Sequence, residues 1–170
     1  IVRSVYVVML IPVQSLSTTA NSLVSNLIGA GGTSHVLQLL HKIARMSFLI
    51  MVVCVVLCVV FRQLVLSVYT GDATLVTEAV PSLYVICGAM LLASFAFVYF
   101  NGISGTGNTQ AALVLEIVVQ VFYALYVIGV GMVLRAPVEI CFTTELVYYV
   151  LMLGLSLVYL KKAKWQNKKI

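Results

Sequence analysis

Charged side chains are scarce in this sequence. Lys, Arg, Asp and Glu make up 9% of its 170 residues, whereas a soluble domain contains about 25%. Hydrophobic residues make up 62%, and the mean hydropathy is +1.13. This composition excludes an ordinary soluble domain and predicts an all-α protein, a polytopic bundle of membrane-spanning helices.

Groups that could support catalysis or metal binding are also few. The two histidines, His35 and His41, are distant in sequence from every cysteine, and we expect them to lie solvated at the membrane interface. No Ser-His-Asp, Cys-His or paired-carboxylate pattern occurs at a readable spacing. We therefore expect no enzyme activity, no cofactor and no metal site, with the cysteines acting as small apolar side chains in the membrane. These are Cys54, Cys58, Cys87 and Cys141.

A nucleotide site lacks its parts as well. The glycines at 29–32 resemble a dinucleotide loop only superficially, because no short strand comes before them and residues 49–51 supply no acid. The second glycine-rich stretch, Gly105-Thr106-Gly107, lacks the third glycine of that motif. We expect both stretches to form tight turns and to allow close helix contacts, and we expect no nucleic-acid partner.

Long apolar segments separated by short polar turns predict five spans. Each is long enough to cross about 30 Å of hydrocarbon, and the short connections make consecutive spans antiparallel neighbours. A polar piece from residue 33 should lie at the interface and run straight into the second span, where Arg62 can reach outward. Asp72 and Glu78 are well placed near the positive end of the third helix. The predicted spans are 4–29, 46–69, 79–100, 111–134 and 140–160.

The basic residues predict an orientation. A cytoplasmic tail at 161–170 places residue 1 outside and leaves only Arg3, Arg62 and Arg135 at the outer ends. Glu145 lies close to that outer surface, where Arg135 or water could satisfy it. A first helix that begins outside, without an initiator Met or signal peptide, predicts the C-terminal part of a longer protein. The inner lysines and arginine are Lys42, Arg45, Lys161, Lys162, Lys164, Lys168 and Lys169, with Trp165 at the headgroup level.

Polar side chains follow one face of the first span. Gln14, Thr18, Asn21 and Ser25 are spaced four, three and four residues apart, and Pro12 predicts a kink before them. Amides and hydroxyls are costly in hydrocarbon, so this row should face a bundle interior or a wet cavity. Two interpretations stay open, a transport pathway and helix packing through small hydroxyl residues.

A carboxylic acid interrupts the fourth span. Glu116 shares a helix face with Gln120 and Tyr123. A carboxylate at that depth costs a few kcal/mol unless it is paired, hydrated or protonated, so Glu116 is the best candidate for ion coupling. The alternative is a protonated Glu116 bonded to a neighbouring helix, such as the first span with its polar row. Glu145, followed by Tyr148 and Tyr149, is a similar residue that we rank lower.

The two glycine-rich turns carry a family resemblance. SNLIGAGG (25–32) and NGISGTGNT (101–109) resemble the two cytoplasmic turns in the C-terminal half of multidrug and toxic compound extrusion (MATE) transporters. The resemblance covers essentially the whole chain and aligns it with the last five of twelve helices. It implies part of a secondary active transporter that exports small amphipathic or cationic compounds by proton or sodium antiport. It also implies a missing N-terminal lobe and a bacterial plasma (inner) membrane.

The chain departs from the family pattern in its acids. The seventh helix of the family, which often carries an acid, would lie before residue 1. Many members also have an acid in the tenth helix, but the matching span from Ala79 has Ser82, Tyr84, Ser94 and Tyr99 and no carboxylate in its middle. Glu116 would have to act in its place. The predicted transport pathway and coupling residues are Gln14, Thr18, Asn21, Glu116, Gln120 and Tyr123.

Two rival functions fit the same pattern of helices. A lipid-linked oligosaccharide flippase of related architecture should carry cationic residues within its spans to bind a pyrophosphate, and mid-span Lys or Arg is absent here. A non-transporting membrane subunit should instead interlock the polar rows of the first and fourth spans without a cavity.

Overall fold

The computed structural model describes residues 2–69, 71–130 and 138–162, and every regular element in these ranges is a helix. Five helices are long and apolar enough to cross a membrane, which confirms the predicted all-α membrane bundle. The end of the predicted fourth span, the turn at 135–137 and the basic tail after Lys162 lie outside the described residues. The elements are α1 (Val2–Gly29), the single 3-10 turn η1 (Thr33–His35), α2 (Val36–Val60), α3 (Arg62–Ser67), α4 (Ala73–Gly105), α5 (Thr109–Ile128), α6 (Val138–Cys141) and α7 (Thr143–Lys162).

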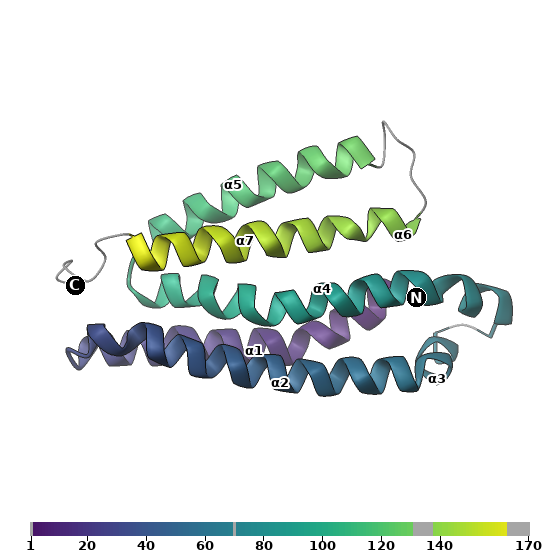
Figure 1. Cartoon of the computed structure of the whole chain (residues 1–170), viewed down its shortest axis with the longest axis horizontal. Coiled ribbons are helices and arrows are strands. Elements are labelled where there is room, and N and C mark those ends of the chain that lie inside the picture. The colour runs from purple at the N-terminus through teal and green to yellow at the C-terminus, as the bar shows by residue number, and fades with distance from the viewer. Residues whose placement is uncertain (1, 70, 131–137, 163–170) are drawn as a thin grey trace.

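The long helices run up and down beside one another, and α4 lies at the centre (Figure 1). It contacts α1 and α2 on one side and α5 and α7 on the other. More than half of its apolar stretch is buried, a larger share than in any other described span. The bundle therefore has two layers joined by α4, and α1 begins at the opposite end of the bundle from where α7 stops.

Helix α4 is longer than a membrane requires. Its 33 residues extend about 50 Å, against about 30 Å of hydrocarbon, so it projects beyond the apolar layer. Asp72 caps its first turn, since its Oδ1 accepts hydrogen bonds from the hydroxyl and the backbone N–H of Thr74 at 2.6 and 2.9 Å. These hydrogen bonds lower the pKa of Asp72 because they stabilise the carboxylate.

The second membrane-length helix includes the polar piece that was expected to run into it. Regular helix begins at Val36 and continues to Val60, within the stretch predicted from residue 33 to residue 69. Thr33 and Ser34 form the 3-10 turn and no side chain caps α2. The helix stops at Phe61, whose backbone angles (φ −96°, ψ 24°) are not helical, and α3 starts at Arg62. The exposed Arg62 is held there by its Nη1, which donates to the Tyr84 hydroxyl of α4 at 3.0 Å.

Both glycine-rich turns use glycine where another residue would be strained. Gly31 and Gly107 have φ of 80° and 78°, in the left-handed region that side chains with a Cβ avoid. The second turn is tied to the end of α7, because the Asn108 amide donates to the Tyr159 hydroxyl. The predicted tight turns are therefore present at both positions.

Glycine also permits close helix contacts at the end of α4. A Cβ on Gly105 would lie 2.7 Å from the backbone oxygen of Asn21 and 2.9 Å from the Cβ of Val24, both on α1. The Ser25 hydroxyl donates to the carbonyl of Gly105 at 3.0 Å across the same contact. The first and third membrane helices are thus locked together where the two glycine-rich turns meet.

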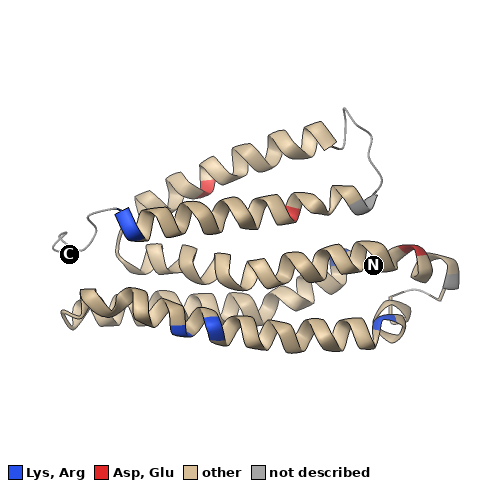
Figure 2. Ribbon diagram, in the orientation of Figure 1, with Lys and Arg blue, Asp and Glu red and all other residues tan. Residues whose placement is uncertain are grey.

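Charge is distributed unevenly between the two ends (Figure 2). We call the end that holds both glycine-rich turns and the last turn of α7 the basic end, and the other the opposite end. The opposite end carries Arg3, Arg62, Asp72 and Glu78 at the ends of α1, α3 and α4. The basic end carries Lys42, Arg45, Lys161 and Lys162 near the start of α2 and at the end of α7.

Candidate functional site

Glu116 lies half-buried on α5 beside α7. Its Oε1 accepts a hydrogen bond from the Tyr148 hydroxyl at 2.9 Å. Its Oε2 is buried and has no partner among the described residues. The neighbouring helix that bonds Glu116 is thus α7 and not α1.

Glu145, in the first turn of α7, is fully partnered. Its Oε2 accepts a hydrogen bond from Tyr6 of α1 at 2.9 Å, and its Oε1 accepts a longer one from Tyr123 of α5 at 3.4 Å. The Tyr6 and Tyr149 hydroxyls are 2.7 Å apart. Because a phenol has one hydrogen and that of Tyr6 points to Glu145, Tyr149 donates to Tyr6. One carboxylate therefore links three helices.

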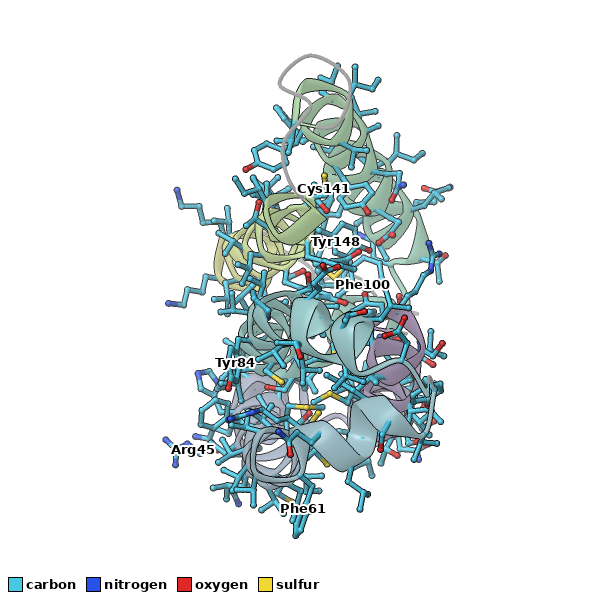
Figure 3. The ribbon with its side chains drawn as sticks, turned by 90° about the vertical axis from the view of Figure 1, so that its right-hand side faces the viewer. Arg45, Phe61, Tyr84, Phe100, Cys141 and Tyr148 are labelled. Atoms are coloured by element: carbon cyan, nitrogen blue, oxygen red, sulfur yellow. The ribbon has the colours of Figure 1, made fainter. Side chains whose placement is uncertain are left out.

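Aromatic contacts join these two groups into one cluster. The ring of Tyr148 makes edge contacts with the rings of Tyr123 and Tyr149, with centroids 5.6 and 5.3 Å apart. Phe97 of α4 closes the cluster against Tyr149 at 5.7 Å. Tyr148 points between α7 and α5 in the end-on view (Figure 3). The tyrosine-carboxylate cluster consists of Tyr6, Glu116, Tyr123, Glu145, Tyr148 and Tyr149.

A small cavity opens beside Glu145 at the opposite end. Its volume is about 220 Å³, which is large enough for several waters. Arg3 and Glu145 both line it, so a cationic and an anionic side chain border the same space. The remaining lining comes from α5, α6 and α7 and the residues next to them: Tyr123, Val127, Val130, Cys141, Phe142 and Thr144.

The polar row of α1 lies on a surface that the described chain does not cover. Gln14, Thr18 and Ser25 are exposed, and Asn21 is half-buried. The Thr18 hydroxyl donates to the carbonyl of Gln14 at 2.7 Å, and Ser15 and Thr19 bond back to their own helix in the same way. The buried face of this part of α1 is formed by Val13, Ser17, Ala20 and Val24.

The predicted pathway residues therefore divide into two groups. Glu116 and Tyr123 belong to the tyrosine-carboxylate cluster. The other four lie outside it, with Gln120 exposed on α5. Within the described ranges, no hydrogen bond joins the α1 row to Glu116 or Gln120. The interlocking of polar rows that a purely structural subunit would require does not occur there. The four residues outside the cluster are Gln14, Thr18, Asn21 and Gln120.

Four of the six members of the cluster are not among the predicted site residues: Tyr6, Glu145, Tyr148 and Tyr149. Tyr148 and Tyr149 follow Glu145 by one helical turn, and this spacing was the available signal. Tyr6 gave no signal, because it lies 139 residues from Glu145 in the chain. Only the order and rotation of the helices bring it to the site.

The histidines and cysteines take no part in this cluster. His35 and His41 are exposed, and the His41 ring lies edge-on to Tyr99 with centroids 5.7 Å apart. None of the four cysteines forms a disulfide bond, and Cys58 and Cys87 are buried among apolar side chains. Among the described residues, no group of three His, Cys, Asp or Glu side chains is arranged to hold a metal ion.

Comparison with known proteins gives one match. The family model MatE matches residues 1–127, three quarters of the chain. This range includes both glycine-rich turns, the polar row of α1 and Glu116. No curated protein and no solved structure matches the chain.

Proposed function

Because this chain belongs to the MatE family of membrane transporters, we propose that it forms part of a secondary active exporter of drugs or toxic organic compounds. Proton or sodium antiport would drive this export. The five membrane-length helices make it a multi-pass membrane protein. The substrates we expect are small amphipathic or cationic molecules.

The uncovered face of α1 supports a second lobe. Gln14 and Thr18 are exposed on this helix, and exposure of an amide to lipid is costly. We therefore propose that these helices are the last five of twelve, and that the α1 row faces an aqueous path between two lobes. Alternating access would then expose this path to one side of the membrane at a time.

A single observation carries the coupling proposal: Glu116 is half-buried in α5 and has a buried oxygen that no described side chain or backbone group bonds. A group in this state is ready to bind a proton or a cation. Ion binding at Glu116 would favour one facing of the transporter and substrate binding the other. The two gradients are then coupled through one conformational equilibrium.

The charge distribution supports an orientation. Lys42, Arg45, Lys161 and Lys162 lie toward the basic end, and cytoplasmic loops are enriched in such residues. We propose that the basic end is cytoplasmic, that the C-terminus lies on that side, and that the membrane is a bacterial plasma (inner) membrane.

Replacement of Glu116 tests the coupling role. In the complete transporter, reconstituted in vesicles, Glu116→Gln should reduce ion-driven efflux of a cationic dye by roughly 10- to 100-fold. A reduction of this size corresponds to a typical coupling free energy of about 1–3 kcal/mol. Dye exchange without an ion gradient should persist, since the amide keeps the shape of the side chain.

Glu78→Gln is the matched control, because Glu78 is an exposed acid near the start of α4. It should transport as the wild type does. If Glu116→Gln kept full ion-driven efflux, the coupling role of Glu116 would be wrong.

A further inference from the structure

Glu145 has no role in the coupling proposed above, yet both of its oxygens accept hydrogen bonds from tyrosines of other helices. We propose that Glu145 is a second proton-binding carboxyl, which takes protons from the cavity at the opposite end and exchanges them with Glu116 through the tyrosines. This inference rests on the proposed antiport and names the proton as its coupling ion.

The partners of both acids favour a proton over a sodium ion. Tyr6 and Tyr123 direct their hydroxyl hydrogens at Glu145, and Tyr148 does so at Glu116. A sodium ion needs several oxygen lone pairs pointing inward, and these hydroxyl groups present hydrogens instead. Donors of this kind remain compatible with a carboxyl group that gains and loses a proton.

The cavity gives Glu145 access to water. Glu145, Thr144 and Tyr123 line its 220 Å³, and Arg3 borders the same space from the start of α1. A carboxyl group that borders a space large enough for several waters can exchange protons with them.

Titratable side chains of α1, α5, α6 and α7 surround Glu145. Each of them lines the cavity or belongs to the tyrosine-carboxylate cluster. The contribution of α4 is Phe97, which does not titrate. The titratable groups are Arg3 and Tyr6 from α1, Tyr123 from α5, Cys141 from α6, and Tyr148 and Tyr149 from α7.

Proton transfer between the two acids conserves atoms and charge. A proton from water binds a Glu145 oxygen, and the Tyr123 hydroxyl turns its hydrogen from Glu145 toward Tyr148. That hydroxyl then accepts the proton of Glu145 while it gives up its own hydrogen on the far side. Tyr148 delivers a proton to Glu116 across their 2.9 Å hydrogen bond. The step to the Tyr148 hydroxyl has only ring contacts in this conformation, so it requires a ring rotation or a bridging water.

Transport by variants of the complete transporter tests the relay. In vesicles loaded with ethidium, Glu145→Gln should reduce efflux driven by a pH gradient about tenfold or more, within the usual range for proton-transfer groups. It should also flatten the pH dependence of efflux, while ethidium exchange at equal pH persists. Tyr123→Phe and Tyr148→Phe, which remove one hydroxyl and keep the ring, should slow gradient-driven efflux only.

Two matched variants control for the loss of an acid or of a phenol. Glu78→Gln removes an exposed acid at the same end, and Tyr126→Phe removes an exposed hydroxyl of α5 that lies 3.4 Å from Thr143. Both should leave efflux and its pH dependence unchanged.

The outcomes separate the two proposals. Unchanged efflux in Glu145→Gln, together with loss in Glu116→Gln, would overturn the relay and leave the antiport standing. Wild-type efflux that responds to a sodium gradient and not to a pH gradient would also overturn the relay alone. Wild-type efflux that responds to neither gradient would overturn the antiport itself.

A measurement on the wild-type transporter covers the case in which Glu145→Gln fails to fold. A hydrophobic carbodiimide modifies carboxyl groups that are protonated in apolar surroundings. Mass spectrometry should find Glu145 and Glu116 modified, more so at lower pH, and the exposed Glu78 far less. Absence of modification at Glu145 over the pH range of transport would contradict the proposal.

Discussion

Two acids of the same bundle differ in how completely their oxygens are bonded. Both oxygens of Glu145 accept hydrogen bonds from tyrosines, whereas Glu116 has one bonded oxygen and one that no described residue bonds. A buried polar atom without a hydrogen bond is costly, whereas a bonded one is not. Glu116 is accordingly the acid on which binding of an ion would have the larger energetic effect.

Gly105 supplies a stability prediction at the same scale. Its missing side chain leaves room for Asn21 and Val24, and a Cβ there would lie 2.7 Å from a backbone oxygen that cannot move freely. Gly105→Ala should destabilise the protein by about 1–3 kcal/mol through overpacking. A lower Tm in detergent, measured by fluorescence or by loss of the monodisperse peak, would show this.

Gly154→Ala is the matched control, because a Cβ at this position of α7 meets nothing within 4 Å. It should keep or slightly raise the Tm, since alanine is the better helix former. Equal Tm losses in both variants would contradict the close-contact explanation.

At the scale of the element, α1 presents two kinds of exposed surface. Between Val7 and Ile11 the exposed residues are apolar, with Ile11 at 59% exposure, and after Pro12 most of them are amides and hydroxyls. The hydroxyls bond back to their own helix, which lowers the cost of leaving them without another partner. A helix with this pattern suits lipid along one part and water along the other.

Thiol labelling tests this division. With the four native cysteines replaced by serine, Thr18→Cys in the complete transporter should react with a charged thiol reagent roughly tenfold or more faster than Val53→Cys, because the reactive thiolate forms only in water. Val53 is the comparison site, at 58% exposure on an apolar face of α2. Equal slow labelling at both positions would mean that the α1 row is dry.

At the scale of the whole molecule, α4 determines the arrangement. It separates α1 and α2 from α5 and α7, so the polar row of α1 and Glu116 of α5 are held in different layers (Figure 1). Helices α1 and α5 are linked through Glu145 of α7, which accepts hydrogen bonds from Tyr6 and Tyr123. A substitution of Glu145 would therefore remove hydrogen bonds to helices of both layers.

Orientation in the membrane gives a prediction at this scale. In cells, Lys42→Cys should be protected from a membrane-impermeant thiol reagent added outside, and Glu78→Cys should be labelled by it, because the basic end is proposed to be cytoplasmic. The cysteine-free protein without either substitution provides the background. The reverse pattern of labelling would invert the proposed topology.

The sequence by itself determined five helices, their antiparallel order and the two glycine-rich turns. These features are local, since they follow from the length of apolar runs and from glycines such as Gly31 and Gly107, which adopt positive φ. It also singled out Glu116 as a polar group within an apolar helix. Its prediction of one continuous second span to residue 69 did not anticipate the break at Phe61, which carries no glycine or proline signal.

Only the tertiary structure decided which side chains meet. The pairing of Tyr6 with Glu145, and the separation of Gln14 and Thr18 from Glu116, depend on how each helix is rotated and which helix lies beside it. Helical periodicity assigns residues to a common face but does not say what that face contacts. Contacts between distant parts of the chain are fixed by side-chain fit across helices, and here α4 and its small residues set that fit.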